Sequence, residues 1–515
     1  MGKLYPIGIQ NFEKIRRDGY CYIDKTSKIY ELVKTGSYYF LSRPRRFGKS
    51  LLISTLEAYF QGKRELFEGL AMQELEKEWK KYPILYLDLN IAKFDTPDSL
   101  SDILNRNLVE WEGLYGSDPA EVSLSLRFAG VVKRACEKTG NRTVILVDEY
   151  DKPMLQAIND PALQDEFRKT LKPFYGVLKS MDGYIKFALL TGVTKFGKVS
   201  VFSDLNNLED ISRNPFYTDI CGITEEELLK NFNDDIQALA DANRQTFEQA
   251  CAQLKENYDG YHFCPGSTGI YNPFSLLNAF KSRQYGSYWF ETGTPTYLVE
   301  LLKKHKYDLY RMAHEKTTSD VLDSIDASST NPIPVIYQSG YLTIKGYIPE
   351  PRIYELGFPN REVEEGFMKF LLPFYTQVSE TESGFAIWDF VSDVKAGDID
   401  DFMARLQSFL ADCPYELAKD IELHYQNVLF IVFRLAGLYT KVEYHTSRGR
   451  IDLVLQTDSY VYVMEFKLDG SAEDAIRQIE EKQYALPFAK DGRKVYSIGV
   501  NFSSEIRNIE RWIVK

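Results

Sequence analysis

Short apolar runs alternate with longer polar segments over residues 1–221. The segments between the runs carry apolar residues at helical spacing. A continuous apolar run is typical of a strand buried on both faces, as in parallel sheets. Strands that alternate with helices in this way predict a mostly parallel α/β sheet. The four runs are GSYYFLS (36–42), YPILYLDLN (82–90), TVILVDEYD (143–151) and YIKFALLTGVT (184–194).

From residue 222 onwards, helical spacing dominates the pattern. Thr224 followed by Glu227 predicts a capping box at a helix start. The segment NPIPV (331–335) is interpreted as a linker or an edge strand, and a short strand pair is expected near 341–355. The C-terminal part predicts, in order, a helix at 415–438, a hairpin at 450–468, a helix at 472–486 and a strand at 494–500.

These changes of pattern predict four parts in an α/β chain. A length of 515 residues exceeds what one hydrophobic core normally serves, so several domains are expected. The parts are an α/β domain that carries a phosphate-binding loop (1–221), a helical lid or middle domain (222–335), a mixed connecting region (336–410) and a C-terminal α/β domain (411–515).

The segment RPRRFGKS at 43–50 follows the first apolar run and precedes an apolar helix. A phosphate-binding loop needs backbone N–H groups at a helix N-terminus, a lysine and a hydroxyl that can reach Mg²⁺. Gly48, Lys49 and Ser50 supply these groups, although Arg43 stands where the usual motif has its first glycine. The candidate nucleotide contacts are Arg43, Pro44, Arg45, Arg46, Phe47, Gly48, Lys49, Ser50 and Leu51.

The run VILVDEYD places acids at the end of a second buried strand. Asp148 is expected to reach a magnesium-bound water together with Ser50, and Glu149 to orient an attacking water. The order of the two motifs favours a nucleotide site over a surface turn that happens to be acidic. Thr191 ends a later strand and is a candidate γ-phosphate sensor, with a polar strand cap as the alternative.

The sequence GRIDLVLQTDSYVYVMEFKLD predicts two strands around the turn TDSY. Glu465 and Lys467 are two residues apart on the second strand and therefore share a face, and Asp452 lies on the partner strand. Carboxylates beside a lysine suit Mg²⁺-assisted phosphodiester hydrolysis, with Asp452 and Glu465 as metal ligands. An exposed cross-strand ion pair is the alternative, but the apolar neighbours in MEFKL make it less natural.

The bulk composition narrows the partners and the compartment. A formal net charge of −12 supplies no long-range attraction for nucleic acid, so any such binding needs a local basic patch. The 6 Cys include no CxxC pair, and the most apolar run, VLFIVF (428–433), is too short to span a bilayer. We therefore expect a cytoplasmic protein with reduced thiols and no membrane contact.

The chain resembles bacterial AAA-ATPase-like proteins that end in a PD-(D/E)XK nuclease-superfamily domain. The resemblance extends over most of the chain through segments such as YIDKTSKIYEL (22–32), FLSRPRRFGKSLL (40–52), ILVDEYDKP (145–153), YDGYHF (258–263) and YVMEFKLDG (462–470). It implies an ASCE-type P-loop core, a helical lid and a restriction-endonuclease-like C-terminal domain. Arg43 at the first glycine position belongs to the family pattern.

The resemblance also implies roles for individual residues. Lys49 and Ser50 would contact phosphate and magnesium, and Asp148 with Glu149 would form the acidic pair. The nuclease-type triad would be Asp452, Glu465 and Lys467, and Asp24 with Lys25 would lie near the nucleotide base.

Two classes of function remain open at this stage. The first is a Mg²⁺-dependent ATPase coupled to a nuclease that acts on DNA or RNA. The second is a nucleotide-dependent switch or sensor whose nuclease-like domain binds a partner without cutting, and the acidic net charge favours it. Assembly into a homo-oligomer is left open by the sequence.

Overall fold

A computed structural model divides the chain into two compact units, 1–298 with 316–362, and 299–315 with 363–515. The division of the chain into four parts is finer than these two units and remains a prediction. The boundary at Glu362 and Val363 falls inside the predicted connecting region. The structure describes residues 3–195, 205–290, 297–323, 325, 331–376, 378–379, 382–411, 421–437, 441–447, 450–490 and 492–515, without the side chains of 297, 421, 441–447 and 450–452.

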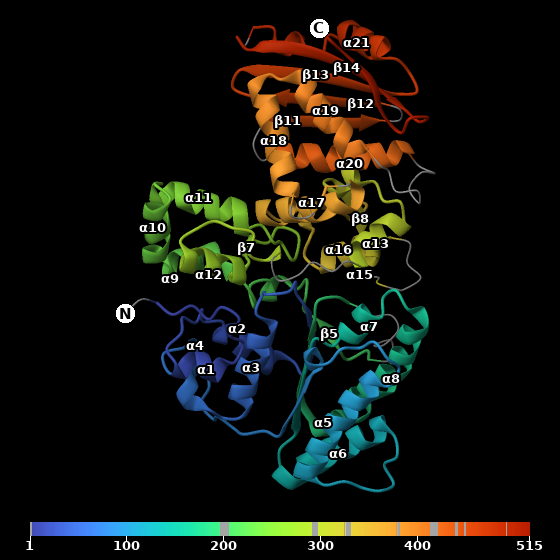
Figure 1. Cartoon of the computed structure of the whole chain (residues 1–515). Helices are drawn as coiled ribbons and strands as arrows, with labels where there is room; N and C mark the ends of the chain where they lie inside the picture. Colours follow the sequence, from blue (N-terminus) through green and yellow to red (C-terminus); the bar gives the residue numbers. More distant parts are fainter. Residues whose placement is uncertain are drawn as a thin grey trace. The chain divides into compact units, whose positions relative to one another are not determined.

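The first unit is built on a parallel five-stranded sheet of order β2-β3-β4-β1-β5, which confirms the α/β class (Figure 1). Strand β4 lies between β1, which leads into the glycine loop, and β3, which ends in the acids. Helix α3 packs on β3 and β4, and α6 packs on β3. The strands are β1 (Tyr38–Ser42), β2 (Ile84–Asp88), β3 (Thr143–Asp148), β4 (Ile185–Gly192) and β5 (Glu209–Asp210).

Helices flank this sheet because their apolar stripes cover its strands. Figure 1 shows α3 and α6 on opposite sides of the strands. Residues 143–148 are all buried, as the continuous apolar run predicts. The helices are α1 (Phe12–Arg17), α2 (Thr26–Thr35), α3 (Lys49–Phe60), α4 (Ala71–Leu75), α5 (Ser99–Tyr115), α6 (Leu124–Thr139), α7 (Lys152–Gln156) and α8 (Pro161–Ser180).

The region after residue 222 is mostly helical, as predicted. Thr224 and Glu227 form the expected capping box at the start of α9. The segment 331–335 is not a linker or strand, because Pro332 and Pro334 lie at the start of a helix, where proline is tolerated. The elements are β6 (Ile223–Thr224), α9 (Glu225–Asn231), α10 (Asn233–Ala242), α11 (Phe247–Tyr258), β7 (Ile270–Tyr271), α12 (Pro273–Ser282), α15 (Ser319–Asp323), α16 (Ile333–Gln338), β9 (Thr343–Ile348) and β10 (Ile353–Gly357).

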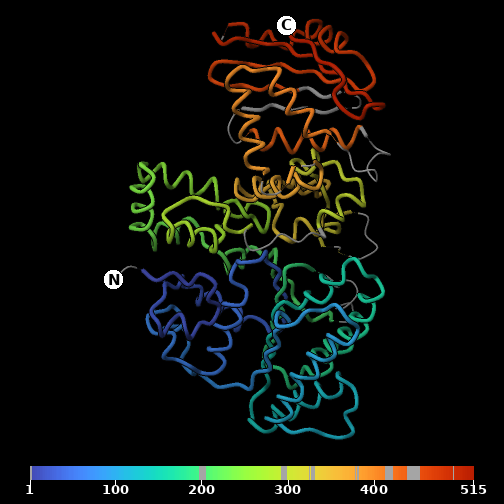
Figure 2. Tube along the Cα trace, viewed as in Figure 1, coloured from blue at the N-terminus to red at the C-terminus, as the bar shows by residue number. Residues whose placement is uncertain are grey.

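The second unit contains a five-stranded sheet of order β11-β12-β13-β14-β15. Val461 and Val463 of β13 pack against α21, whereas the alternate residue Tyr462 contacts α19 through Phe402. Helices therefore cover both faces of this sheet, with α21 on one face and α19 on the other. Figure 2 shows the Cα trace of residues 363–515 of this unit in orange and red. The strands are β11 (Lys441–Ser447), β12 (Arg450–Gln456), β13 (Tyr460–Leu468), β14 (Lys494–Ser503) and β15 (Asn508–Val514).

The predicted hairpin and the helix predicted from 472 are present, and the helix predicted at 415–438 is present as α20 (Ile421–Ala436), with residues 415–420 and 438 outside the described part of the structure. Strands β11 and β15 are additions that the pattern did not predict. None of the helices within the described ranges has the length and apolar content needed to cross a membrane. The remaining elements are α13 (Tyr297–Lys304), α14 (Leu309–Met312), β8 (Glu315–Thr318), α17 (Arg361–Tyr375), α18 (Ser383–Ala396), α19 (Ile399–Leu410), α20 (Ile421–Ala436) and α21 (Ala472–Glu481).

Candidate functional site

The loop at 43–50 connects β1 to the first turn of α3. Arg46 and Gly48 have positive φ angles of 67° and 98°, and Gly48 is the N-cap of the helix. A turn of this kind directs successive backbone N–H groups towards one point, which suits an anion. Arg43 is not among the positive-φ residues, so its backbone does not require the glycine of the usual motif.

Lys49 is buried at the start of α3 and points back over the loop. Its Nζ donates to the carbonyl oxygens of Arg43 (3.1 Å) and Pro44 (3.4 Å). The same Nζ lies 3.4 Å from Oε1 of Glu149. The structure therefore brings together the lysine and the second acid that the sequence predicts as one site.

The acids lie where β2 and β3 end side by side. Asp148 is 2% exposed, and its Oδ1 accepts from Oγ1 of Thr191 at 2.6 Å and from the Glu149 N–H at 3.1 Å. Thr191 thus positions Asp148 from the neighbouring strand β4. Glu149 has a φ of 52°, a left-handed conformation that costs a non-glycine residue free energy and is common at functional sites.

Two further acids at this edge were not predicted as site residues. Asp88 is the register partner of Asp148, and burial followed by the charges of Asp148 and Glu149 raises its pKa. Asp151 is fully buried and accepts from the N–H groups of Val193 (3.2 Å) and Thr194 (2.6 Å). Burial followed by repulsion from Glu149 raises the pKa of Asp151 to about 7. Asp151 ties the turn after β3 to the end of β4.

The three arginines of the loop differ in how deeply their side chains are buried. The Arg43 guanidinium is 1% exposed and donates to the carbonyls of Ser42 (2.9 Å), Ser212 (2.8 Å) and Tyr217 (2.9 Å). Arg43 therefore contributes its backbone to the loop while its side chain supports the surrounding fold. Burial lowers the pKa of the Arg43 guanidinium, although arginine stays protonated in proteins. Arg46 is exposed and lies over the Phe274 ring at 4.9 Å, and the Arg45 carbonyl accepts from the Trp289 indole at 3.1 Å.

An apolar cavity adjoins the helix end of the loop. Its empty space is about 660 Å³, the opening to solvent included. Gly48 and Leu51 form one wall, and Cys21, Ile23 and Cys221 form others. Lys25, which the resemblance places near the base, also lines the cavity, where its Nζ lies 2.6 Å from Glu227. Residues of the loop and of the DKT element therefore meet at one cavity.

Asp24 and Thr26 of the same DKT element serve a different role, which is to hold the start of α4. Oδ1 of Asp24 accepts from the Thr26 N–H at 2.9 Å, and Oδ2 accepts from the Ala71 N–H at 2.8 Å. Oγ1 of Thr26 accepts from the Met72 N–H at 3.0 Å. These bonds satisfy the first N–H groups of α4, so Asp24 acts in this structure as support for the segment that carries Lys25.

The donor set of the loop fits ATP with Mg²⁺. Ser50 is half-buried in the first turn of α3, and Asp148 is a buried carboxylate at the end of β3. Magnesium takes hard oxygen ligands and is commonly held by one or two side chains together with phosphate oxygens and water. Within the described residues, no three side chains among His, Cys, Asp and Glu converge to hold a metal by themselves.

The second candidate site lies on β13 in the other unit. Glu465 is fully buried, and the Nζ of Lys467 lies 3.0 Å from its Oε1. Lys467 also donates to Oε1 of Gln478 on α21. Asp452 is the register partner of Glu465 across β12 and β13, and its side chain lies outside the described part of the structure.

Comparison with known proteins connects both sites to named families. A family model described as "Predicted AAA-ATPase" matches residues 6–202, and one described as "PD-(D/E)XK nuclease superfamily" matches residues 420–512. The chain is 34% identical over 527 residues to the "Uncharacterized protein in vnfD 5'region" of Azotobacter chroococcum mcd 1, covering 100% of this chain and 99% of that protein. No solved structure matches the chain.

Proposed function

Because the chain belongs to the family of predicted AAA-ATPase proteins that end in a PD-(D/E)XK nuclease-superfamily domain, we propose that it binds and hydrolyses ATP with Mg²⁺. The observation that carries this proposal is the buried Lys49 Nζ, held against loop carbonyls and 3.4 Å from Glu149. A lysine in this position is ready to exchange those partners for phosphate oxygens.

In this proposal the loop binds the phosphates through backbone N–H groups between Arg46 and Ser50. Lys49 leaves the Arg43 and Pro44 carbonyls and contacts the terminal phosphates as a point charge. Ser50 and Asp148 hold Mg²⁺, which neutralises charge that develops on the phosphates. Thr191 keeps Asp148 in place through the 2.6 Å hydrogen bond to its Oδ1.

The apolar cavity beside Gly48 is proposed to receive the adenine base. Its walls are largely aliphatic and thiol side chains, which suit the faces of a base better than a charged group. The cavity is lined by Gly48 and Leu51, so a nucleotide whose phosphates lie on the loop would have this cavity beside it for its base. Lys25, held by Glu227, would mark the polar margin of this subsite.

Glu149 is proposed to orient and deprotonate the attacking water. Its carboxylate contacts Lys49 in this structure, and nucleotide binding would free it when Lys49 turns to the phosphates. Glu149→Gln keeps the size of the side chain and removes the base. We expect ATP affinity within about threefold of wild type and turnover lower by roughly 100-fold or more.

The measurement is steady-state ATP hydrolysis with Mg²⁺, alongside equilibrium binding of ATP to both proteins. An exposed acid of the same unit, Glu256→Gln, serves as the matched control and should leave turnover unchanged. Wild-type turnover in Glu149→Gln would remove Glu149 from the mechanism. If the wild-type chain hydrolysed no ATP, the proposed hydrolysis would be wrong, and only the proposal of nucleotide binding would stand.

We also propose that the C-terminal domain acts as a Mg²⁺-dependent nuclease on DNA or RNA, with nucleotide state as its control. The support is the Glu465–Lys467 pair on one face of β13, with Asp452 in register across the hairpin. Asp452 and Glu465 would hold Mg²⁺, and Lys467 would position water or stabilise developing charge. We further propose that the protein is cytoplasmic and that it forms a homo-oligomer.

A nucleotide-dependent switch with an inactive nuclease-like domain is the second candidate. The formal net charge of −12 favours it, because a nuclease must hold a polyanion. The two candidates differ in whether Mg²⁺ binds at Asp452 and Glu465. Crystals soaked with Mn²⁺ would distinguish them, because an anomalous peak at Glu465 supports the nuclease and a blank site supports the switch.

A further inference from the structure

A second cavity lies at the other end of the phosphate loop, beside its first two residues. Arg43 and Pro44 line it together with Lys195, Arg213 and Tyr261. Its empty space is about 410 Å³, the opening to solvent included. The adenine cavity proposed above shares none of these residues. The lining belongs entirely to the first unit.

Three hydrogen-bond donors of this lining have no acceptor among the described residues. They are Nε of Arg43, Nη1 of Arg213 and the hydroxyl of Tyr261. Arg43 is 1% exposed and Tyr261 is 2% exposed. Burial also raises the pKa of the Tyr261 hydroxyl, which keeps it a donor. Buried donors without an acceptor cost folding free energy, and their rarity in native proteins points to a missing partner.

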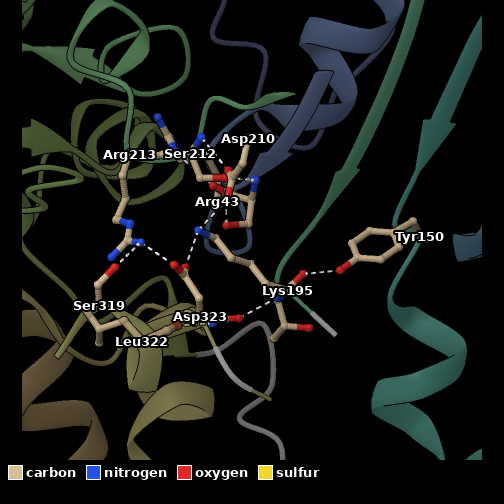
Figure 3. A network of polar contacts seen from close by, with 12 residues as sticks. Arg43, Tyr150, Lys195, Asp210, Ser212, Arg213, Ser319, Leu322 and Asp323 are labelled. Atoms are coloured by element: carbon tan, nitrogen blue, oxygen red, sulfur yellow. Dashed lines mark hydrogen bonds and ion pairs between the residues drawn. The ribbon is translucent and has the colours of Figure 1, made fainter. Parts of the chain in front are cut away.

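Charged side chains of this lining take part in the network of polar contacts drawn in Figure 3. Lys195 is buried and lies 2.8 Å from both Asp210 and Asp323. Arg213 pairs with the same Asp323. Arg43 has only carbonyl acceptors and the Phe263 ring, 3.9 Å from its guanidinium carbon, among the described residues. Among the described residues, Asp210 and Asp323 therefore pair with Lys195 and Arg213, and no carboxylate lies within ion-pairing distance of Arg43.

The three donors without an acceptor and the Arg43 guanidinium without a carboxylate partner, both taken among the described residues, indicate the class of ligand. Water could accept hydrogen bonds from the three donors, but it would not give the buried Arg43 guanidinium an anionic partner. A small oxyanion supplies several acceptor oxygens and the missing negative charge together. Guanidinium groups and hydroxyls are common partners of tetrahedral oxyanions such as phosphate.

We propose that this cavity binds inorganic phosphate at a site distinct from the nucleotide contacts proposed between Arg46 and Ser50. The ion accepts from Arg43 Nε, Arg213 Nη1 and the Tyr261 hydroxyl. Its binding holds the first residues of the loop and Lys195, which follows β4, in one arrangement.

The test is isothermal titration of the full chain with sodium phosphate, against sodium chloride at equal ionic strength. Tyr261→Phe removes one hydroxyl and is expected to weaken phosphate binding about tenfold. Arg213→Gln provides a second variant if Tyr261→Phe is unstable, and it should weaken binding by a similar factor. Lys49→Ala should leave phosphate affinity unchanged, because Lys49 lies outside this cavity.

The outcomes separate this site from the nucleotide site. Unchanged affinity in both Tyr261→Phe and Arg213→Gln, or loss of phosphate binding in Lys49→Ala, would overturn the proposal. Absence of phosphate binding to the wild-type chain would overturn it as well. ATP affinity, measured on the same proteins, reports the nucleotide site separately, so failure there leaves the cavity result standing.

Discussion

A Lys49→Ala protein is expected to bind ATP at least about 100-fold more weakly than wild type. The substitution removes a buried cation that would make charge-assisted hydrogen bonds to the terminal phosphates. Each such bond is worth roughly 1.5–3 kcal/mol. Two of them account for an affinity change of this size, because 1.4 kcal/mol corresponds to about tenfold. Equilibrium binding of a fluorescent ATP analogue measures the effect directly.

The control for this prediction must separate lost contacts from lost folding. Lys49 also bonds to the Arg43 and Pro44 carbonyls, so thermal unfolding of the variant is measured in parallel. Lys133→Ala removes an exposed lysine of the same unit and should leave ATP affinity unchanged. Wild-type affinity in a folded Lys49→Ala protein would contradict the assignment of the loop.

A Lys467→Ala protein is expected to cut nucleic acid at least about 100-fold more slowly, since the variant loses the cation beside the proposed metal-binding acids. ATP turnover should stay within about twofold of wild type, because the variant leaves the loop and its acids untouched. The assay follows degradation of labelled DNA and RNA substrates with Mg²⁺, in the presence and absence of ATP. The exposed Lys490 of the same domain gives the matched control, Lys490→Ala.

The folding of the Lys467→Ala protein must be measured separately, by thermal unfolding. Removal of Lys467 leaves the fully buried Glu465 without the ion pair at 3.0 Å, which is destabilising. Assays are therefore run below the melting temperature of the variant. If the wild-type chain cuts no substrate under any nucleotide condition, the nuclease proposal fails and the switch becomes the better account.

The main elements of the fold could be predicted because their signals are local. The capping box of Thr224 and Glu227 depends on four consecutive residues, and the structure has it. The buried run at 143–148 likewise depends only on its own composition. β15 was missed because its partner β14 is antiparallel and its alternation is weak, so only pairing makes it a strand. At 331–335 two prolines suggested a break, whereas they begin a helix.

Parts of the candidate site were predictable for the same reason. Lys49 and Glu149 stand in recognisable motifs, and the structure brings them within 3.4 Å. Asp88 could have been found as an acid near the end of a predicted strand (82–90), which the structure pairs with β3. The role of the Arg43 side chain could not have been predicted. Its carbonyl partners include residues 212 and 217, which only the tertiary fold places beside Arg43.

The most direct test of the central claim is a crystal structure of the full chain with a non-hydrolysable ATP analogue and Mg²⁺. The account predicts the β- and γ-phosphates on the N–H groups between Arg46 and Ser50, with Lys49 Nζ moved from the Arg43 carbonyl onto a phosphate oxygen. It predicts the base in the cavity lined by Cys21 and Cys221. An empty loop with Lys49 still bonded to Arg43, or a nucleotide bound elsewhere on the chain, would contradict it.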